Sequence, residues 1–243
     1  MTKRPFAVFD IDGTLIRWQL YHAIIEDLIA SGTISSEYAE KIEAARRTWK
    51  QRLDGASFGD YEMTLVHTYH DLLTSLPHKP FEEAVERVFE LHKDQVYTYT
   101  RNLLRELKSR GYLLFAISGS HQEAVTKLGD YYGFDATIGA HYGHTNGHFT
   151  GERSSPVDIG KGPLLKQLVD EWGATWDGSL AIGDSRSDAA MLELVEQPIA
   201  FNPNRELFEI AREQGWRIVV ERKDMIYTLE QGDAAYVLAE TNA

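Results

Sequence analysis

Short runs of β-branched and aromatic residues alternate with segments of helical periodicity through most of the 243-residue chain. The runs that predict strands are 6–9, 113–117, 136–138, 180–182, 199–201 and 218–220. The helical segments between them are 98–110, 121–132, 161–172, 187–195 and 205–214. Strand, helix, strand order of this kind favours an α/β fold, with a Rossmann-like parallel sheet core and helices on both faces.

The segment from Trp18 to Val96 breaks this alternation, because it has helical periods and no convincing strand. Apolar residues recur at helical spacing in two stretches of it. They are Tyr38, Ile42, Ala45, Trp49 and Leu53 in the first stretch and, after Pro80 as the first helical residue, Phe81, Ala84, Val88 and Leu91 in the second. We therefore expect an all-helical insert at 17–96 and an α/β core made of 1–16 and 97–243.

Composition and charge restrict the compartment and the partners. Hydrophobic residues make up 43% of the chain and charged residues 26%, which is typical of a soluble globular protein. No stretch of about 18 uncharged apolar residues occurs, so we expect neither a membrane-spanning helix nor a membrane partner. The chain has no Cys, which excludes disulfides and a Cys nucleophile and fits a cytoplasmic protein. A net charge of -12 makes nucleic acid an unfavourable partner.

Two carboxylates come directly after the first predicted strand. Asp10 and Asp12 belong to Asp10-Ile11-Asp12-Gly13-Thr14, at the carboxyl end of a strand, where ligands bind in open α/β sheets. Extended backbone puts both on the same side, and two neighbouring acids need a cation or a proton between them. Mg²⁺ suits oxygen ligands in a site that also takes phosphate. The alternative is an ordinary turn after a strand.

Three later segments carry further polar groups. Ser118-Gly119-Ser120 ends a buried strand and offers a phosphate cradle, although Ser-Gly is also common in loops. Lys161 begins a predicted helix and would neutralise phosphoryl oxygens, unless it is simply solvated. Asp184 follows another buried strand and is placed to complete a magnesium site. Asp188 could orient its neighbours, cap the following helix, or do both.

In this order, Asp-x-Asp, Ser, Lys and Gly-Asp-x-x-x-Asp resemble the four motifs of the haloacid dehalogenase superfamily of phosphohydrolases. The helical insert between the first two motifs resembles the C1 cap of the branch that includes phosphoserine phosphatases, called subfamily IB. Segments 147–151 and 202–216 also resemble that subfamily. The resemblance extends over roughly residues 5–220 and implies a phosphatase that uses Mg²⁺ and a small phosphorylated substrate.

The resemblance also implies an aspartyl-phosphate mechanism. Asp10 is then the nucleophile, and Asp12 protonates the leaving alkoxide and later takes a proton from water. The groups implied for Mg²⁺ are the carboxylates of Asp10 and Asp184 and the backbone carbonyl of Asp12, with Asp188 behind them; those implied for phosphate are Ser118, the Gly119 N–H and Lys161. The ion and Lys161 would make a local positive site inside an acidic protein.

The insert departs from the phosphoserine phosphatases at two positions. The resemblance implies a Glu nine residues after the nucleophile, where this chain has Gln19, and an Arg seven residues after a Phe, which from Phe58 reaches Leu65. Arg46, Arg47 or Arg52 could compensate. We therefore expect a small phosphorylated metabolite other than L-phosphoserine as the substrate, with a phosphoserine phosphatase proper as the alternative.

Other interpretations remain open on the sequence. A signalling receiver domain also phosphorylates an Asp, but after its third strand, where this chain has no acid at 138–140. A noncatalytic phosphate-binding or signalling module of the same fold usually lacks one of the acids, and none is missing here. His141, His144 and His148 could bind a metal, although Asn146-Gly147 indicates a hairpin with exposed turn histidines.

Four residues of the insert are candidates for contacting the substrate. Trp18 and Gln19 are favoured as substrate contacts because they follow the loop of Asp10 directly. His67 and His70, which are spaced three apart on a predicted helix, are the less favoured candidates. No oligomeric state is predicted.

Overall fold

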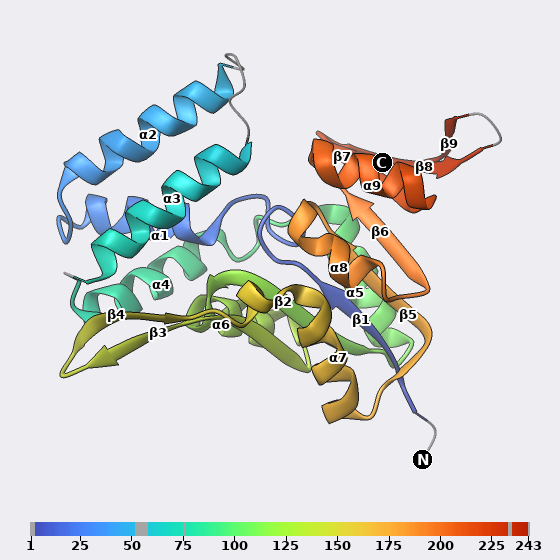
Figure 1. Cartoon of the computed structure of the whole chain (residues 1–243), viewed down its shortest axis with the longest axis horizontal. Coiled ribbons are helices and arrows are strands. Elements are labelled where there is room, and N and C mark those ends of the chain that lie inside the picture. The colour runs from blue at the N-terminus through green and yellow to red at the C-terminus, as the bar shows by residue number, and fades with distance from the viewer. Residues whose placement is uncertain (1–2, 52–57, 75, 233–234, 243) are drawn as a thin grey trace. The chain divides into compact units, whose positions relative to one another are not determined.

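The computed structural model describes residues 3–51, 58–74, 76–232 and 235–242, and the chain divides into two compact units (Figure 1). The first unit consists of Met1–Arg17, Asp94–Gly139 and Ser155–Ala243. The second consists of Trp18–Lys93 and Ala140–Ser154. The first unit therefore contains the predicted α/β elements, and most of the second is the predicted helical insert.

Over the described residues, the strands form one mixed sheet in the order β4-β3-β2-β1-β5-β6-β7-β8-β9. The strands are β1 Pro5–Phe9, β2 Leu113–His121, β3 Ala136–Thr145, β4 His148–Ser154, β5 Thr175–Gly183, β6 Gln197–Phe201, β7 Arg217–Arg222, β8 Met225–Gln231 and β9 Tyr236–Asn242. Strand β1 pairs in parallel with β2 and β5, and the parallel pairing continues through β6 to β7. Strands β8 and β9 are antiparallel additions that the sequence did not predict.

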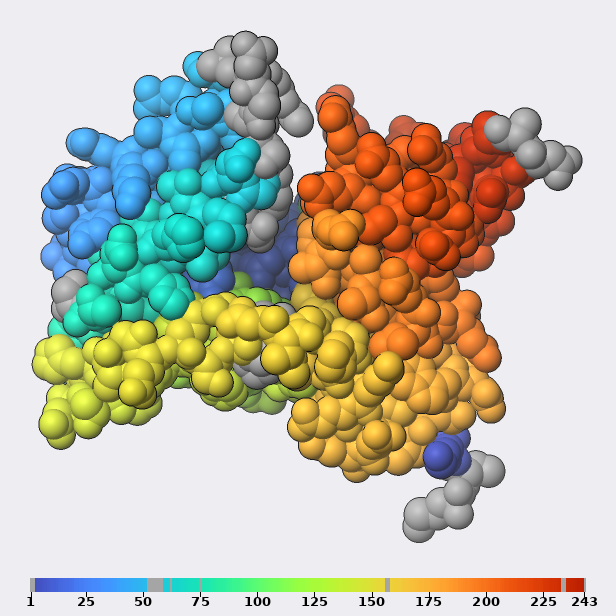
Figure 2. Space-filling model, in the orientation of Figure 1, coloured from blue at the N-terminus to red at the C-terminus, as the bar shows by residue number. Residues whose placement is uncertain are grey.

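Helices cover both faces of this sheet, and its central strands are therefore buried on both sides, as in β1. The helices of the first unit are α5 Thr98–Ser109, α6 Gln122–Tyr132, α7 Lys161–Trp172, α8 Ala189–Leu192 and α9 Arg205–Gln214, with short 3-10 turns η1 Pro156–Ile159 and η2 Arg186–Asp188. Phe6, Phe115 and Leu168 belong to one buried cluster on the face of α7. Helices α7, α8 and α9 form a continuous outer layer in Figure 2, whereas α5 and α6 lie behind the sheet in Figure 1.

Helix α8 is shorter than the predicted helix 187–195. It ends at Leu192, and the chain then turns so that the Glu196 N–H donates to Ser179 Oγ at 3.2 Å. This bond lies just before β6, which pairs with β5, and the helix itself is only four residues long.

The second unit contains four helices in its described residues and one hairpin. The helices are α1 Leu20–Ala30, α2 Ser36–Lys50, α3 Phe58–Leu73 and α4 His78–His92. The hairpin joins the end of β3 to β4, and its Phe149 ring meets Phe81 of α4 edge to face at 5.3 Å. The His78 N–H also donates to the Gly147 carbonyl at 2.8 Å. The unit is therefore helical with a two-stranded addition, which the predicted all-helical insert did not include.

Two details of the predicted insert helices are wrong. Helix α4 begins at His78, two residues before Pro80, and Leu91 is 71% exposed although Phe81, Ala84 and Val88 are buried. In the last turn of α4, the ring of His92 lies 5.1 Å from that of Trp18. In α2, Ile42 is buried while Tyr38, Ala45 and Trp49 are half-buried, and Leu53 lies outside the described residues.

The predicted histidine turn is a hairpin. Asn146 and Gly147 both have positive φ, 50° and 78°, as a two-residue hairpin turn requires. His141, His144 and His148 are exposed on its two strands, and they do not form a metal-binding group among the described residues. None of the described helices is long and apolar enough to cross a membrane.

Candidate active site

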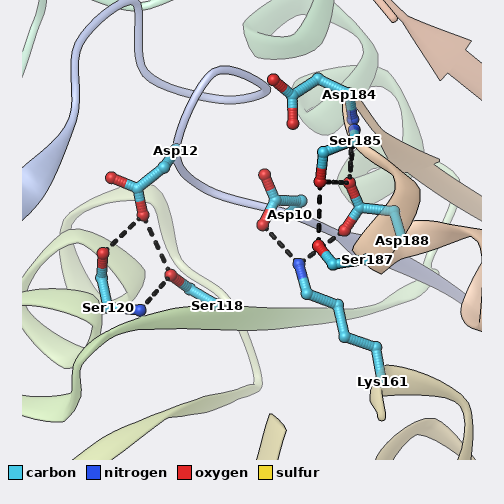
Figure 3. A network of polar contacts seen from close by, with 9 residues as sticks. All are labelled: Asp10, Asp12, Ser118, Ser120, Lys161, Asp184, Ser185, Ser187 and Asp188. Atoms are coloured by element: carbon cyan, nitrogen blue, oxygen red, sulfur yellow. Dashed lines mark hydrogen bonds and ion pairs between the residues drawn. The ribbon is translucent and has the colours of Figure 1, made fainter. Parts of the chain in front are cut away.

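The carboxyl ends of three neighbouring strands carry most of the polar residues that the sequence singles out (Figure 3). Asp10 follows β1, Ser118 lies near the end of β2, and Asp184 follows β5. Because β1 is parallel to both neighbours, these three ends meet at one edge of the sheet. Lys161, the first residue of α7, extends its side chain to the same place (Figure 3).

Lys161 is held between two carboxylates. Its Nζ donates to Oδ1 of Asp10 at 2.5 Å and to Oδ1 of Asp188 at 2.6 Å. Lys161 is 3% exposed, Asp10 is 6% exposed and Asp188 is fully buried. The lysine is therefore not solvated, and its charge is used inside the protein.

Burial and neighbouring charges shift the protonation of this cluster. Burial raises the pKa of Asp10 from 3.8 to about 7; Lys161 opposes that rise, and the Asp188 and Asp12 carboxylates add to it. Burial acts against the charge of Lys161, but Asp10 and Asp188 outweigh it and raise the Lys161 pKa above its usual range. The carboxyl groups of Asp10, Asp12 and Asp188 outnumber the one ammonium of Lys161, and a cation bound beside them would favour the ionised form of Asp10.

The donor set fits a hard divalent cation. Asp10, Asp184 and Asp188 each offer a carboxylate oxygen, and the three oxygens lie within 4.8 Å of one another. Oxygen ligands of this kind are those that Mg²⁺ prefers. Space for the Asp184 carboxylate depends on Gly13, which has φ +78°; a Cβ atom there would lie 2.4 Å from Asp184 Oδ2. The loop after β1 and the loop after β5 are therefore fitted to each other.

Asp188 is hydrogen-bonded through both oxygens. Its Oδ1 accepts from Lys161, while its Oδ2 accepts from the Asp184 N–H at 3.0 Å, the Ser185 N–H at 2.9 Å and the Ser185 hydroxyl at 3.2 Å. Asp188 and Ser185 form a capping box at η2. Asp188 consequently both caps the turn and orients Lys161 and the Asp184 backbone, which leaves Asp10 and Asp184 as the carboxylates best suited to a metal.

Asp12 faces the end of β2 and turns away from Asp10 (Figure 3). Its Oδ2 accepts from the Ser118 hydroxyl at 3.1 Å and from the Ser120 hydroxyl at 2.7 Å. Gly119 lies between the two serines in β2 and is half-buried. Ser120 was not among the predicted site residues, although residues two apart on a strand share a face and the sequence shows Ser at both positions.

The predicted substrate contacts of the insert lie in the second unit. The Trp18 ring packs against His92, and Gln19 is the N-cap residue of α1. His67 is exposed, whereas the half-buried His70 ring lies 5.4 Å from the ring of Tyr142. Within this unit, Trp18 and His70 pack against other aromatic rings, and Gln19 precedes the first turn of α1.

Comparison with known proteins identifies the family. Residues 7–193, more than half of the chain, match the haloacid dehalogenase-like hydrolases. A phosphoserine phosphatase of Methanocaldococcus jannaschii is 24% identical over 225 residues, covering 92% of this chain and 95% of that protein. A histidinol-phosphatase of Neisseria meningitidis is 25% identical over 232 residues, covering 89% of this chain and 98% of that protein.

Solved structures share the fold. A phosphoserine phosphatase bearing an analogue of its phospho-aspartyl intermediate matches with a TM-score of 0.66 at 22% identity, over 92% of this chain and 96% of that one. A Bordetella pertussis protein of unknown function matches with a TM-score of 0.69 at 19% identity, over 89% and 98% of the two chains. The predicted fold class and the predicted resemblance to phosphoserine phosphatase-like enzymes are both confirmed. The chain therefore belongs to the haloacid dehalogenase-like hydrolases, as a phosphatase of the phosphoserine phosphatase-like branch.

Proposed function

We propose that this protein is a magnesium-dependent phosphomonoester hydrolase that acts on a small phosphorylated metabolite through an aspartyl-phosphate on Asp10. The observation that carries the proposal is the buried contact of Asp10 with Lys161, beside the carboxylate of Asp184. A nucleophile, a fixed positive charge and an acidic metal site at one strand edge are the parts that phosphoryl transfer through a carboxylate needs.

In the first half-reaction, a carboxylate oxygen of Asp10 bonds to phosphorus as the ester P–O bond breaks. Asp12 gives its proton to the departing alkoxide, which leaves as an alcohol. In the second half-reaction, a water molecule attacks the phosphorus of phospho-Asp10 and loses a proton to Asp12. The P–O bond to Asp10 breaks, inorganic phosphate leaves, and both aspartates return to their starting states.

The remaining residues bind and orient. Asp10 and Asp184, with the backbone carbonyl of Asp12, would hold Mg²⁺, and the ion would neutralise charge on the phosphoryl oxygens when bound. Lys161 supplies a second positive charge to those oxygens, and Ser118 and the Gly119 N–H donate hydrogen bonds to them. Asp188 keeps the Lys161 ammonium beside Asp10.

The second unit supports a substrate other than L-phosphoserine. Leu65 is 2% exposed and aliphatic, so it offers no bidentate partner to a substrate carboxylate. Gln19 carries no charge for a substrate amino group. Three arginines were candidates to replace the missing carboxylate partner. Of these, Arg46 donates to Glu43 at 3.1 Å, Arg47 is exposed, and Arg52 lies outside the described residues.

The alternative, a phosphoserine phosphatase, is favoured by the name of the Methanocaldococcus relative. The experiment is a comparison of kcat/KM with Mg²⁺ across phosphoserine, histidinol phosphate, sugar phosphates, phosphocholine-like esters and nucleotides. We expect the kcat/KM of a small ester other than phosphoserine to exceed that of phosphoserine by at least tenfold. The reason is that one lost charged contact costs about 1.5 kcal/mol, which corresponds to a factor of about ten. Phosphoserine in first place would contradict the substrate proposal and leave the reaction class standing.

A further inference from the structure

We propose that Ser120 is a positioning residue, which holds the carboxylate of Asp12 for proton transfer through the hydrogen bond from its hydroxyl. The inference rests on the proposed function, since it assigns Asp12 the role of general acid and base. Ser120 has no role in the mechanism above, yet its hydroxyl donates the shorter of the two bonds to Asp12 Oδ2, 2.7 Å against 3.1 Å from Ser118.

The surroundings of Ser120 make this contact specific. Ser120 is 3% exposed and belongs to β2, a central strand of the sheet. Its backbone N–H donates to the Ser118 hydroxyl oxygen at 3.0 Å, so one residue orients both the neighbouring hydroxyl and the Asp12 carboxylate (Figure 3). A buried hydroxyl with a fixed backbone can hold an acceptor in one direction.

Substrate binding separates the roles of the two serines. Ser118 is proposed to donate its hydroxyl to a phosphoryl oxygen, and a hydroxyl has a single proton to donate. When the Ser118 hydroxyl donates its hydrogen bond to the substrate, the Ser120 hydroxyl still donates its own to Asp12. A donor on Oδ2 restricts rotation of the carboxylate, so that the other oxygen, Oδ1, keeps one direction for proton transfer.

Positioning of this kind affects turnover more than substrate binding. A displacement of a catalytic group by about 1 Å can reduce the rate by roughly 100-fold. We therefore expect Ser120→Ala to lower kcat by about tenfold to 100-fold and to change KM by less than about twofold for an alkyl phosphate.

The variants are chosen to separate positioning from folding. Ser120→Thr keeps a hydroxyl and should recover most of the lost kcat. Ser120→Cys keeps a small, unbranched side chain with a weaker donor, so its kcat should approach that of Ser120→Ala. Ser179→Ala is the control, because Ser179 is also a fully buried serine on a central strand and its hydroxyl bonds to the backbone N–H of Glu196. Its kcat should equal that of the parent.

A double-mutant cycle with Asp12→Asn tests the route of the effect. If Ser120 acts through Asp12, adding Ser120→Ala to Asp12→Asn should lower kcat by less than about twofold further. The full loss in the Asp12→Asn background would overturn the inference, as would a raised KM with unchanged kcat, which would indicate direct phosphate binding. An unchanged kcat in Ser120→Ala would overturn it as well. A parent protein inactive on every phosphomonoester would instead contradict the proposed function and, with it, this inference.

Discussion

Lys161 Nζ lies 2.5 Å from Oδ1 of Asp10, a residue 151 positions earlier in the chain, and both side chains are buried. The contact joins the start of α7 to the end of β1 and places the positive charge of the Lys161 ammonium beside the carboxylate of the proposed nucleophile. The same ammonium contacts Asp188, so removing it would leave two buried carboxylates without their cation.

Replacing Lys161 by Met should therefore lower the stability of the fold. Breaking a buried ion pair by removing one partner costs about 3 to 5 kcal/mol, so the free energy of unfolding should fall by that amount. Urea denaturation measures it, with Lys166→Met, an exposed lysine on the same helix, as the matched control. We expect the control to change the unfolding free energy by less than about 0.5 kcal/mol. Equal losses in the two variants would contradict the assignment.

The raised pKa of Asp10 predicts a pH dependence of stability in protein freed of divalent ions. A carboxyl group with a pKa of 3.8 unfolded and about 7 folded contributes stability that is fully present below pH 3.8 and is lost as the pH rises through 7. Compared with Asp10→Asn, the parent should lose unfolding free energy between pH 4 and pH 7, by roughly 1.4 kcal/mol per unit of pKa shift at most. Urea denaturation with a chelator at several pH values checks this. A difference that stays constant with pH would contradict it, and excess Mg²⁺ should reduce the difference, because the cation takes the place of the proton.

Gly13→Ala should weaken Mg²⁺ binding, because the new methyl group would meet the Asp184 carboxylate at 2.4 Å. Gly111→Ala is a matched control: Gly111 has φ +80° against +78° for Gly13, and a Cβ there meets nothing within 4 Å. Both variants should lose about 1 to 2 kcal/mol of unfolding free energy through the left-handed backbone. We expect only Gly13→Ala to lower Mg²⁺ affinity in calorimetric titration. Equal affinities in the two variants would show that Asp184 does not depend on this space.

Asp12→Asn should slow the chemistry and leave Mg²⁺ affinity nearly unchanged, because the implied metal ligand at this position is the backbone carbonyl. Loss of general acid and base assistance is worth roughly 100-fold to 10,000-fold in kcat. Steady-state kinetics at saturating Mg²⁺ and a metal titration of the same sample provide the two readouts. Collapse of metal affinity with unchanged kcat in the saturated enzyme would reverse the assigned roles.

The buried elements of the first unit could be predicted from the sequence. Strand β1 is an apolar run and β5 ends in one, at 180–182, and an acidic residue follows each strand closely, so both the sheet and the edge that carries Asp10 and Asp184 follow from the pattern. The outer strands could not be predicted in this way. Strand β9 is largely exposed, and β4 buries Phe149 as its one fully covered side chain, so neither has the apolar run that marks a central strand.

Residues with two roles were harder to predict than residues with one. Asp188 is both a cap and the partner of Lys161, which the sequence allowed but did not decide. Ser120 belongs to the same Ser-Gly-Ser segment as Ser118, but the sequence assigns it no role, because its contact with Asp12 depends on the loop after β1 returning to the end of β2. Leu91 has the correct helical spacing, yet it is exposed, so the spacing alone did not decide which residues of α4 are buried.

In the proposed mechanism the phosphoryl group passes through Asp10, and a rapid acid quench of the enzyme during turnover, followed by mass spectrometry of its peptides, tests this step. We predict one phosphoryl group on the peptide that contains Asp10, lost again when substrate is exhausted, and no such adduct in Asp10→Asn. Steady turnover with no phosphorylated peptide, or a phosphoryl group on another residue, would contradict the aspartyl-phosphate mechanism.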